Sequence, residues 1–212
     1  MEQRRRDGVR HRLSDWLYDK GPGQYYQPAY AHIASAIGLD QGAFLDVGCG
    51  PGWLSIHLAE GHPELDAIGI DLSPRMIEQA NRHKHQRLNV TFREMDAEHI
   101  SYPDGTFDRA AAVQSAHHWQ DKAAILEEVH RVLSPGAFFF IYEADRAAST
   151  VPAEWIHRIG VWPPDSMVRL GWRRYGMDDA EWDALKAVVQ ASPFQGGEDG
   201  RHGFYRRLVL AR

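Results

Sequence analysis

Residues 45–52 read LDVGCGPG, and the interpretation of the rest of the chain starts from this stretch. A short apolar run ends at Val47, and Gly48, Gly50 and Gly52 then follow at alternate positions. Glycine adopts backbone conformations closed to other residues, so such a stretch turns sharply and brings its N–H groups close to a ligand. We therefore predict a strand that runs into a ligand-binding turn, with a helix after it.

The residues around the glycines restrict the ligand. A dinucleotide-binding turn needs Gly or Ala three positions after Gly50, and Trp53 stands there; the phosphate-binding ending Gly-Lys-Ser/Thr is also missing. Asp46, just before the turn, would repel a pyrophosphate but attract an ammonium or sulfonium group. The turn is thus predicted to bind a cationic ligand.

Between residues 44 and 142, short apolar runs alternate with helical stretches. Strands are predicted over residues 44–47, 67–71, 90–95, 107–113 and 137–142, the last of which is apolar on both faces. Ser73 with Pro74 begins one helix, and Asp121 precedes another that Ser134-Pro135-Gly136 ends. This alternation predicts an α/β fold with a doubly wound, mostly parallel sheet, which binds ligands at the carboxyl ends of its strands.

Asp71 ends the second predicted strand, at the sheet edge where the ligand is expected. A carboxylate in this place accepts two hydrogen bonds from ribose hydroxyls. A ribose combined with a positively charged amino-acid tail describes S-adenosyl-L-methionine. We therefore predict S-adenosyl-L-methionine as the cofactor.

Five motifs now resemble, in order and spacing, those of class I S-adenosylmethionine-dependent methyltransferases, nearest to the small-molecule branch with the ubiquinone/menaquinone-biosynthesis enzymes. They are LDVGCGPG, GIDLSPRMI, FREMDAEHI, YPDGTFDRAAAVQSAHHW and LSPGAFFFIYE. The resemblance implies a seven-stranded Rossmann-like methyltransferase fold in which the terminal RRLVLAR is the antiparallel strand. We expect a single domain over residues 1–212. Its expected parts are an N-terminal helical cap (1–41), a cofactor-binding core (42–144), a lid inserted after the fifth strand (145–177) and a last helix with C-terminal strands (178–212).

The resemblance also implies which residues contact the cofactor. Around the methionine part these are Asp46, Gly48, Cys49 and Gly50; at the ribose, Asp71; beside the adenine, Leu72, Met76, Asp96 and Ala97; beneath the sulfonium, Gln114 and Ser115. In the family a tyrosine before the first strand often closes the pocket. Tyr18, Tyr25 and Tyr26 are the candidates, and Tyr25 is kept in the predicted site.

His117 and His118 follow the fourth predicted strand, where the methyl group would be presented, and are the candidate catalytic residues. Histidine ordinarily titrates near neutral pH, so one of them could accept a proton from an acceptor hydroxyl or carbon acid. The alternative is that one packs and caps the next helix while the other is solvated. Cys49 is interpreted as a small buried residue, and no metal is expected because no ligand set with metal-binding spacing is evident.

The predicted function is methyl transfer from S-adenosyl-L-methionine to a small organic acceptor by in-line displacement. Nucleic acid is disfavoured because the chain carries a net charge of -5 and reads Gln-Ser-Ala-His after the fourth strand, where enzymes acting on planar amines have Asn/Asp-Pro-Pro-Tyr. The alternatives are a non-catalytic cofactor-binding subunit or scaffold, a nucleic-acid methyltransferase, or a related transfer such as aminopropyl transfer.

The surroundings of the protein can also be anticipated. A single cysteine suits the reducing cytoplasm, and no apolar stretch of signal-peptide or membrane-span length is seen, so no membrane partner is expected. A homodimer is one candidate for the oligomeric state. Trp155, Trp162 and Trp172, in the predicted lid, are expected to form a cap over the acceptor or the lid's own small core.

Overall fold

The computed structural model describes residues 27–148 and 176–212 of the chain. The described helices are α3 (Gln27–Ile37), α4 (Trp53–Ala59), α5 (Pro74–His83), α6 (Lys122–Val132) and α9 (Asp179–Ala191), with a short 3-10 turn η1 (Ala116–His118). The strands are β1 (Gly42–Val47), β2 (Leu65–Asp71), β3 (Val90–Glu94), β4 (Phe107–Val113), β5 (Leu133–Ala144), β6 (Glu198–His202) and β7 (Tyr205–Ala211).

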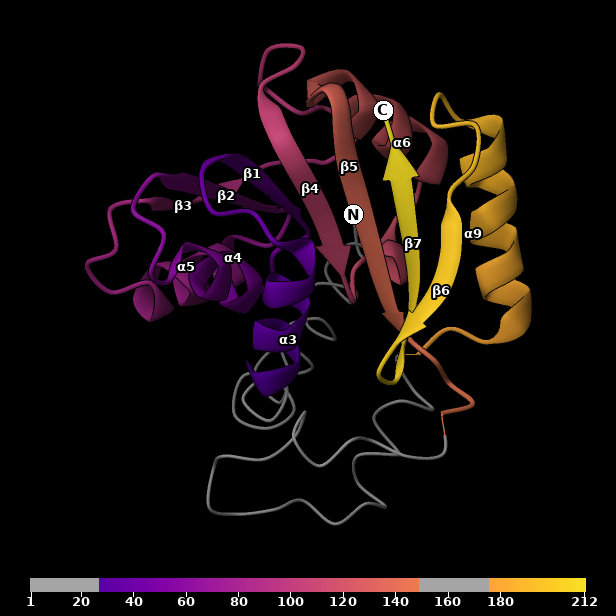
Figure 1. The fold of residues 1–212 in the computed structure, drawn as a ribbon, viewed down its shortest axis with the longest axis horizontal. Coiled ribbons are helices and arrows are strands. Elements are labelled where there is room, and N and C mark those ends of the chain that lie inside the picture. The colour runs from indigo at the N-terminus through magenta and orange to yellow at the C-terminus, as the bar shows by residue number, and fades with distance from the viewer. Residues whose placement is uncertain (1–26, 149–175) are drawn as a thin grey trace, which may run out of the picture.

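All seven strands form one sheet in the order β3-β2-β1-β4-β5-β7-β6 (Figure 1). The pairs among β1 to β5 are parallel, whereas β7 runs antiparallel to both of its neighbours. The expected seven-stranded, mostly parallel methyltransferase sheet is confirmed, including the antiparallel strand near the C-terminus.

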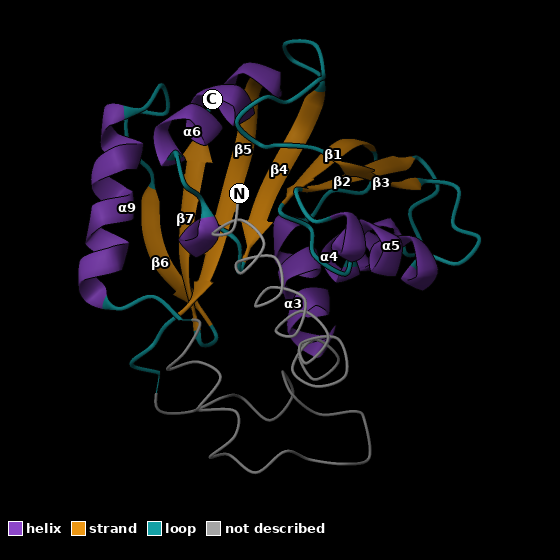
Figure 2. Ribbon diagram, turned by 180° about the vertical axis from the view of Figure 1, so that it is seen from behind, coloured by secondary structure: helices purple, strands orange, loops and turns teal. Residues whose placement is uncertain are grey.

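Helices cover both faces of this sheet. On one face α3, α4 and α5 lie beside β1 to β3, and Ile33, Leu54 and Tyr142 belong to the core beneath them (Figure 2). On the other face α6 and α9 lie along β5 to β7, over a core that includes Leu126 and Trp182. Strands between two helical layers bury apolar residues on both sides, which explains the continuous apolar run of β5.

The predicted helix starts are correct. Ser73 caps α5 by accepting a hydrogen bond from the Met76 backbone at 3.4 Å, and Asp121 caps α6 by accepting one from the Ala124 backbone at 3.0 Å. Asp178 begins α9 with a capping box in which its side chain and that of Glu181 each accept a backbone hydrogen bond. Short polar residues satisfy the donors that a helix leaves open at its start.

Two strands, β5 and β6, differ from the sequence prediction by more than two residues. β6, with the sequence EDGRH, was not among the strands predicted by residue range. Its exposed and half-buried polar residues carry no apolar signal, and pairing with β7 defines it as a strand. β5 begins at Leu133 rather than Ala137, because it continues through Gly136, whose φ is 81°, with a shift of register against β4. Ser134-Pro135-Gly136 thus follows the end of α6 but lies inside β5.

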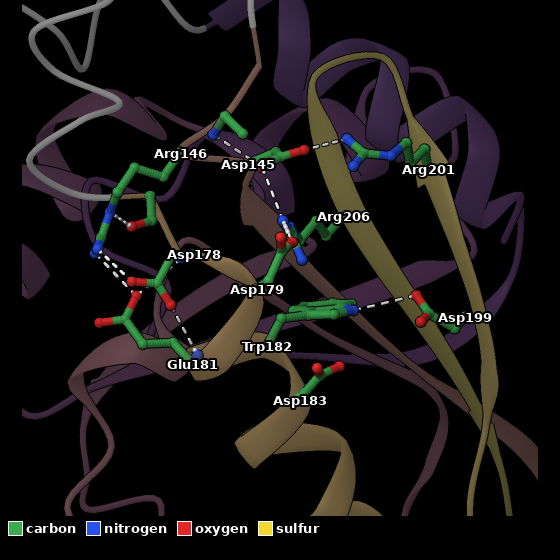
Figure 3. Close-up of polar contacts among 12 residues, drawn as sticks. Asp145, Arg146, Asp178, Asp179, Glu181, Trp182, Asp183, Asp199, Arg201 and Arg206 are labelled. Atoms are coloured by element: carbon green, nitrogen blue, oxygen red, sulfur yellow. Dashed lines mark hydrogen bonds and ion pairs between the residues drawn. The ribbon is translucent and has the colours of Figure 1, made fainter.

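A network of charged side chains joins β5, β7, β6 and α9 at one end of the sheet (Figure 3). The buried carboxylate of Asp145 accepts hydrogen bonds from Arg201 and Arg206, and Arg206 also donates to Asp179. Beside it, Asp145 forms an isolated parallel bridge with Met177. The chain therefore leaves β5 and returns toward α9 at one place.

Candidate functional site

The strand order reverses between β1 and β4, so the carboxyl ends of these two parallel strands lie side by side while their following segments go to opposite faces. This is the point at which doubly wound sheets bind ligands. The glycine turn follows β1, and Gln114, Ser115 and η1 follow β4. The two segments touch: a Cβ atom added to Gly48 would lie 2.6 Å from Cβ of Ser115.

The three glycines of the turn have different surroundings. Gly48 is packed on Ser115, and a Cβ atom at Gly52 would lie 2.4 Å from the ring of Phe92. A Cβ atom at Gly50, in contrast, would meet no atom within 4 Å. All three have positive φ, so all three need glycine for the backbone, but only Gly50 borders open space. A ligand that lies on the turn therefore has room at Gly50.

Asp71 joins this turn to the start of α5. Its carboxylate accepts hydrogen bonds from the Gly50 backbone at 2.9 Å and from the Ser73 backbone at 2.8 Å. It is half-buried at the sheet edge, and a carboxylate has about four acceptor positions, enough to bind diol hydroxyls in addition. The next residue, Leu72, is 68% exposed, which places an apolar surface beside this carboxylate. Met76 is half-buried on the first turn of α5.

Asp46 lies beneath the turn rather than on its surface. It is buried, and the Ser55 hydroxyl of α4 donates to its Oδ2 at 2.8 Å. Burial raises the pKa of Asp46 to about 7, against the lowering effect of the hydrogen bonds from Ser55. Near neutral pH this carboxyl is thus poised between its two forms, and a cation bound nearby would favour the charged one.

Cys49 is buried within the same turn. Burial, together with the charges of Asp46 and Asp71, raises the pKa of its thiol well above the ordinary value. A thiol held in its protonated form is a poor nucleophile. The interpretation of Cys49 as a small packing residue agrees with this environment.

Asp96 and Ala97 follow β3, at the same edge of the sheet as Asp71, because β2 and β3 are parallel neighbours. Asp96 is exposed, and its Oδ1 accepts a hydrogen bond from the Glu98 backbone at 2.9 Å. Arg131 of α6 holds the loop that follows, by donating to the carbonyl oxygens of Ile100 and Tyr102. The predicted adenine side of the site thus rests on an anchored loop.

The exit of β4 carries two signs of a functional site. Gln114 has a φ of 57°, an uncommon value for a residue other than glycine, and its buried Nε2 has no hydrogen-bond partner among the described residues. Ser115 is held by donation from its hydroxyl to the Val47 carbonyl at 2.8 Å. Strained backbone and unsatisfied buried amides are kept where a site needs them. Gln114 is therefore suited to donate to a ligand.

His117 contacts Glu143, which was not predicted as a site residue from the sequence. Its Nδ1 lies 2.8 Å from Oε2 of Glu143, a fully buried residue near the end of β5. The ring of His118 lies against it, with centroids 3.9 Å apart. The available signal was one acidic residue at the end of the apolar run FFFIYE, which patterning alone cannot distinguish from a strand boundary.

Several predicted features lie outside the described residues. They are Tyr18, Tyr25, Tyr26, the lid tryptophans Trp155, Trp162 and Trp172, and most of the segment 145–177. Within residues 27–148 and 176–212, no three His, Cys, Asp or Glu side chains gather so that they could hold a metal ion. No helix in the same ranges combines the length and the apolar character needed to cross a membrane.

Comparisons with known proteins point in one direction. Residues 45–141 match the family model described as methyltransferase domain. Demethylmenaquinone methyltransferase of Deinococcus radiodurans is 32% identical over 120 residues, covering 56% of this chain and 50% of that protein. For 27-O-demethylrifamycin SV methyltransferase of Amycolatopsis mediterranei the identity is 31% over 123 residues, covering 55% and 45%. The chain thus spans about half the length of the curated relatives it matches.

The fold has solved counterparts over nearly its whole length. A structure from Methanococcus maripaludis, described as an S-adenosyl-L-methionine-dependent methyltransferase, superimposes with a TM-score of 0.72. The match covers 95% of this chain and 91% of that one, at 19% sequence identity. At this identity the likeness establishes the arrangement of helices and strands.

Proposed function

Because residues 45–141 match the family model of a methyltransferase domain, we propose that the chain moves a methyl group from S-adenosylmethionine to a small organic acceptor. The observation that carries the proposal is the junction of β1 and β4. There a glycine turn, open at Gly50, is hydrogen-bonded to the carboxylate of Asp71. An open turn and a carboxylate suited to bind a diol, which lie together at the switch point of the sheet, support the proposal.

The described residues fit the cofactor part by part. Gly48, Cys49 and Gly50 would line its methionine part, and the carboxyl of Asp46, with its pKa near 7, would be driven to the charged form by the ammonium. Asp71 would hold the ribose. Most buried amide groups have a hydrogen-bond partner, but Nε2 of Gln114 has none among the described residues. This nitrogen would donate to the bound cofactor.

The adenine would lie between two described elements. The exposed side chain of Leu72 and the half-buried Met76 would flank the base, and Asp96 with Ala97 would meet its amino group. The adenine would cover the exposed side chain of Leu72, and burial of this apolar surface would favour cofactor binding. Tyr25 stays a proposed pocket-closing residue.

When bound, S-adenosylmethionine supplies an electrophilic methyl group and a neutral leaving group. The chain then has to align the acceptor with that group and keep water away, both of which lower the barrier without covalent catalysis. Ser115 is held by its hydrogen bond to the Val47 carbonyl and by packing on Gly48. Together with the turn from Ala116 to His118, it would form the surface on which the acceptor is aligned. His117 or His118 would receive a proton if the acceptor has one to lose.

The acceptor class is proposed from two lines of support. The relatives' names refer to a menaquinone precursor and to a rifamycin, both small organic molecules. The net charge of -5 also opposes binding to phosphate backbones. We further propose a cytoplasmic location, because a lone, buried cysteine suits a reducing compartment, and a homodimer, which light scattering on the purified protein would test.

The proposal is tested by transfer of radiolabelled methyl groups from S-adenosylmethionine. Quinols, phenols and amines are offered beside bulk transfer RNA, each with the wild-type protein and with Asp71→Ala. We expect label in a small molecule with the wild-type protein only. Label in transfer RNA alone would favour a nucleic-acid methyltransferase, and cofactor binding without any labelled product would favour a non-catalytic scaffold.

A further inference from the structure

Glu143 is fully buried, and its described hydrogen bonds all go to the turn η1. Oε1 accepts from the backbone N–H of Ala116 at 2.7 Å and from that of His117 at 3.3 Å. Oε2 lies 2.8 Å from Nδ1 of the His117 ring. The carboxylate of Glu143 thus holds both the backbone and the side chain of His117.

If Glu143 is ionised, this arrangement determines which nitrogen of His117 carries the hydrogen. An ionised carboxylate only accepts, so Nδ1 must be the donor, and in the neutral ring Nε2 then has a lone pair and no hydrogen. Nε2 is buried and has no hydrogen-bond partner among the described residues. The ring therefore has an unused acceptor, three residues along the chain from Gln114, whose Nε2 also has no partner among the described residues.

We propose that Glu143 is a positioning residue that holds His117 as the Nδ1–H tautomer, so that Nε2 takes the proton of the methyl acceptor. The inference rests on the proposed function and deepens it: the acceptor carries an O–H or an acidic C–H group. As the new bond to the methyl carbon forms, Nε2 of His117 accepts the proton. The electron pair of the broken carbon–sulfur bond stays on sulfur, and the imidazolium later releases its proton to solvent.

A carboxylate that merely stabilised the turn would need no particular histidine tautomer, and Glu143→Gln separates the two roles. The two backbone N–H groups require the amide oxygen at the position of Oε1, which turns the NH₂ group toward Nδ1 of His117. The turn keeps its acceptor, but Nδ1 must now accept and the hydrogen moves to Nε2. The variant thus removes the proposed base with little change in packing.

Long-range ¹H–¹⁵N NMR of the ¹⁵N-labelled full-length protein reads the tautomer directly, above the pH at which the ring is charged. Disappearance of signals in His117→Gln assigns the His117 ring. His83 serves as an internal reference, because its Nδ1 lies 3.0 Å from the Pro51 carbonyl, which can only accept. We expect the Nδ1–H pattern for His117 in the wild type and the Nε2–H pattern in Glu143→Gln, with His83 unchanged.

The wild-type spectrum can overturn the proposal even where Glu143→Gln fails to fold. An Nε2–H tautomer for His117 would mean that a protonated Glu143 donates to Nδ1, and it would overturn the inference. For any O–H or C–H acceptor that turns over, Glu143→Gln and His117→Gln should each lower kcat at least about 100-fold, with affinity for S-adenosylhomocysteine within about twofold of wild type. Wild-type kcat in both variants would also overturn it.

The two proposals fail in different measurements. If the protein does not bind S-adenosylhomocysteine, the proposed function fails, whatever the tautomer is. If it binds but the His117 ring has the wrong tautomer, only the role of Glu143 fails.

Discussion

Asp46 and Asp71 lie on the neighbouring strands β1 and β2, and their carboxyl groups differ in chemistry because their environments differ. Asp71 is half-buried at the sheet edge and ties the glycine turn to α5, in a place where it can reach a ligand. Asp46 is enclosed beneath the same turn and bonded to Ser55. Both were predicted as cofactor contacts from sequence, but only the structure shows that burial separates their chemistry.

Asp71→Ala should weaken binding of S-adenosylhomocysteine by about 1.5–3 kcal/mol, the scale of lost hydrogen bonds to a charged group. Titration calorimetry measures the change. Asp66→Ala is a matched control, since it removes an exposed aspartate from the same strand. Equal affinities for Asp71→Ala and the wild type would refute a ribose-binding role.

Asp46 should make the stability of the cofactor-free protein fall with rising pH. Its folded pKa of about 7 lies above the ordinary 3.8, so between these values the folded state holds a proton that the unfolded chain has lost. The contribution of Asp46 is therefore complete below about pH 4 and is lost as pH rises to about 7. Asp46→Asn, which stays neutral and keeps an acceptor for Ser55, abolishes this dependence.

Urea denaturation at pH 5 and pH 8 measures the effect. Relative to wild type, Asp46→Asn should gain on the order of 2–4 kcal/mol between the two pH values. Asp40→Asn, at an exposed position, should show no such gain. The same stability difference between Asp46→Asn and wild type at both pH values would contradict the predicted burial effect.

At the scale of elements, burial determines which helices and strands can be predicted from the sequence. Strands with two buried faces, such as β4 and β5, are continuous apolar runs, and their helices begin at short polar caps, so both can be found by pattern. β6 has neither signal and is defined by its partner β7. Glu143 could not be predicted as a site residue, because its role depends on η1, which is distant in sequence and adjacent only in the fold.

Arg131 is predicted to stabilise the loop between β3 and β4. Its guanidinium donates to the carbonyl oxygens of Ile100 and Tyr102 and to the carboxylates of Glu128 and Asp104, and these hydrogen bonds raise its pKa further. Arg131→Ala should lower the free energy of unfolding by about 1–3 kcal/mol, because the loop carbonyls lose a charged donor.

Chemical denaturation of Arg131→Ala measures this loss. Arg82→Ala is the control, since it removes an exposed arginine whose contact with Glu78 is 3.7 Å long, and it should stay within about 0.5 kcal/mol of wild type. If both variants were equally stable, the loop would not depend on Arg131.

At the scale of the whole molecule, one sheet joins β1 to β4, where the cofactor is proposed to bind, to β5, β7 and β6, which complete its far edge. The charged network around Asp145 connects β5 with β6, β7 and α9 (Figure 3). Burial alone would raise the pKa of Asp145, but hydrogen bonds from Arg201, the Ala147 backbone and Arg206 together hold it below the ordinary value. The carboxylate is therefore charged in the folded protein and needed by two arginines.

Asp145→Ala should destabilise the protein by about 3–5 kcal/mol, because it leaves the buried Arg206 without its buried partner. Thermal and urea unfolding would show the loss. Asp183→Ala, which removes an exposed carboxylate from α9, should change stability by less than about 0.5 kcal/mol. A loss below about 1 kcal/mol in Asp145→Ala would mean that the network does not hold this edge together.

We propose that the junction of β1 and β4 binds S-adenosylmethionine. Titration calorimetry of the wild-type protein with S-adenosylhomocysteine tests it most directly, since no acceptor has to be known. We expect saturable binding of one molecule per chain in the micromolar range, weakened by Asp71→Ala and unaffected by Asp66→Ala. Absence of binding at millimolar ligand, or equal loss in the two variants, would contradict it.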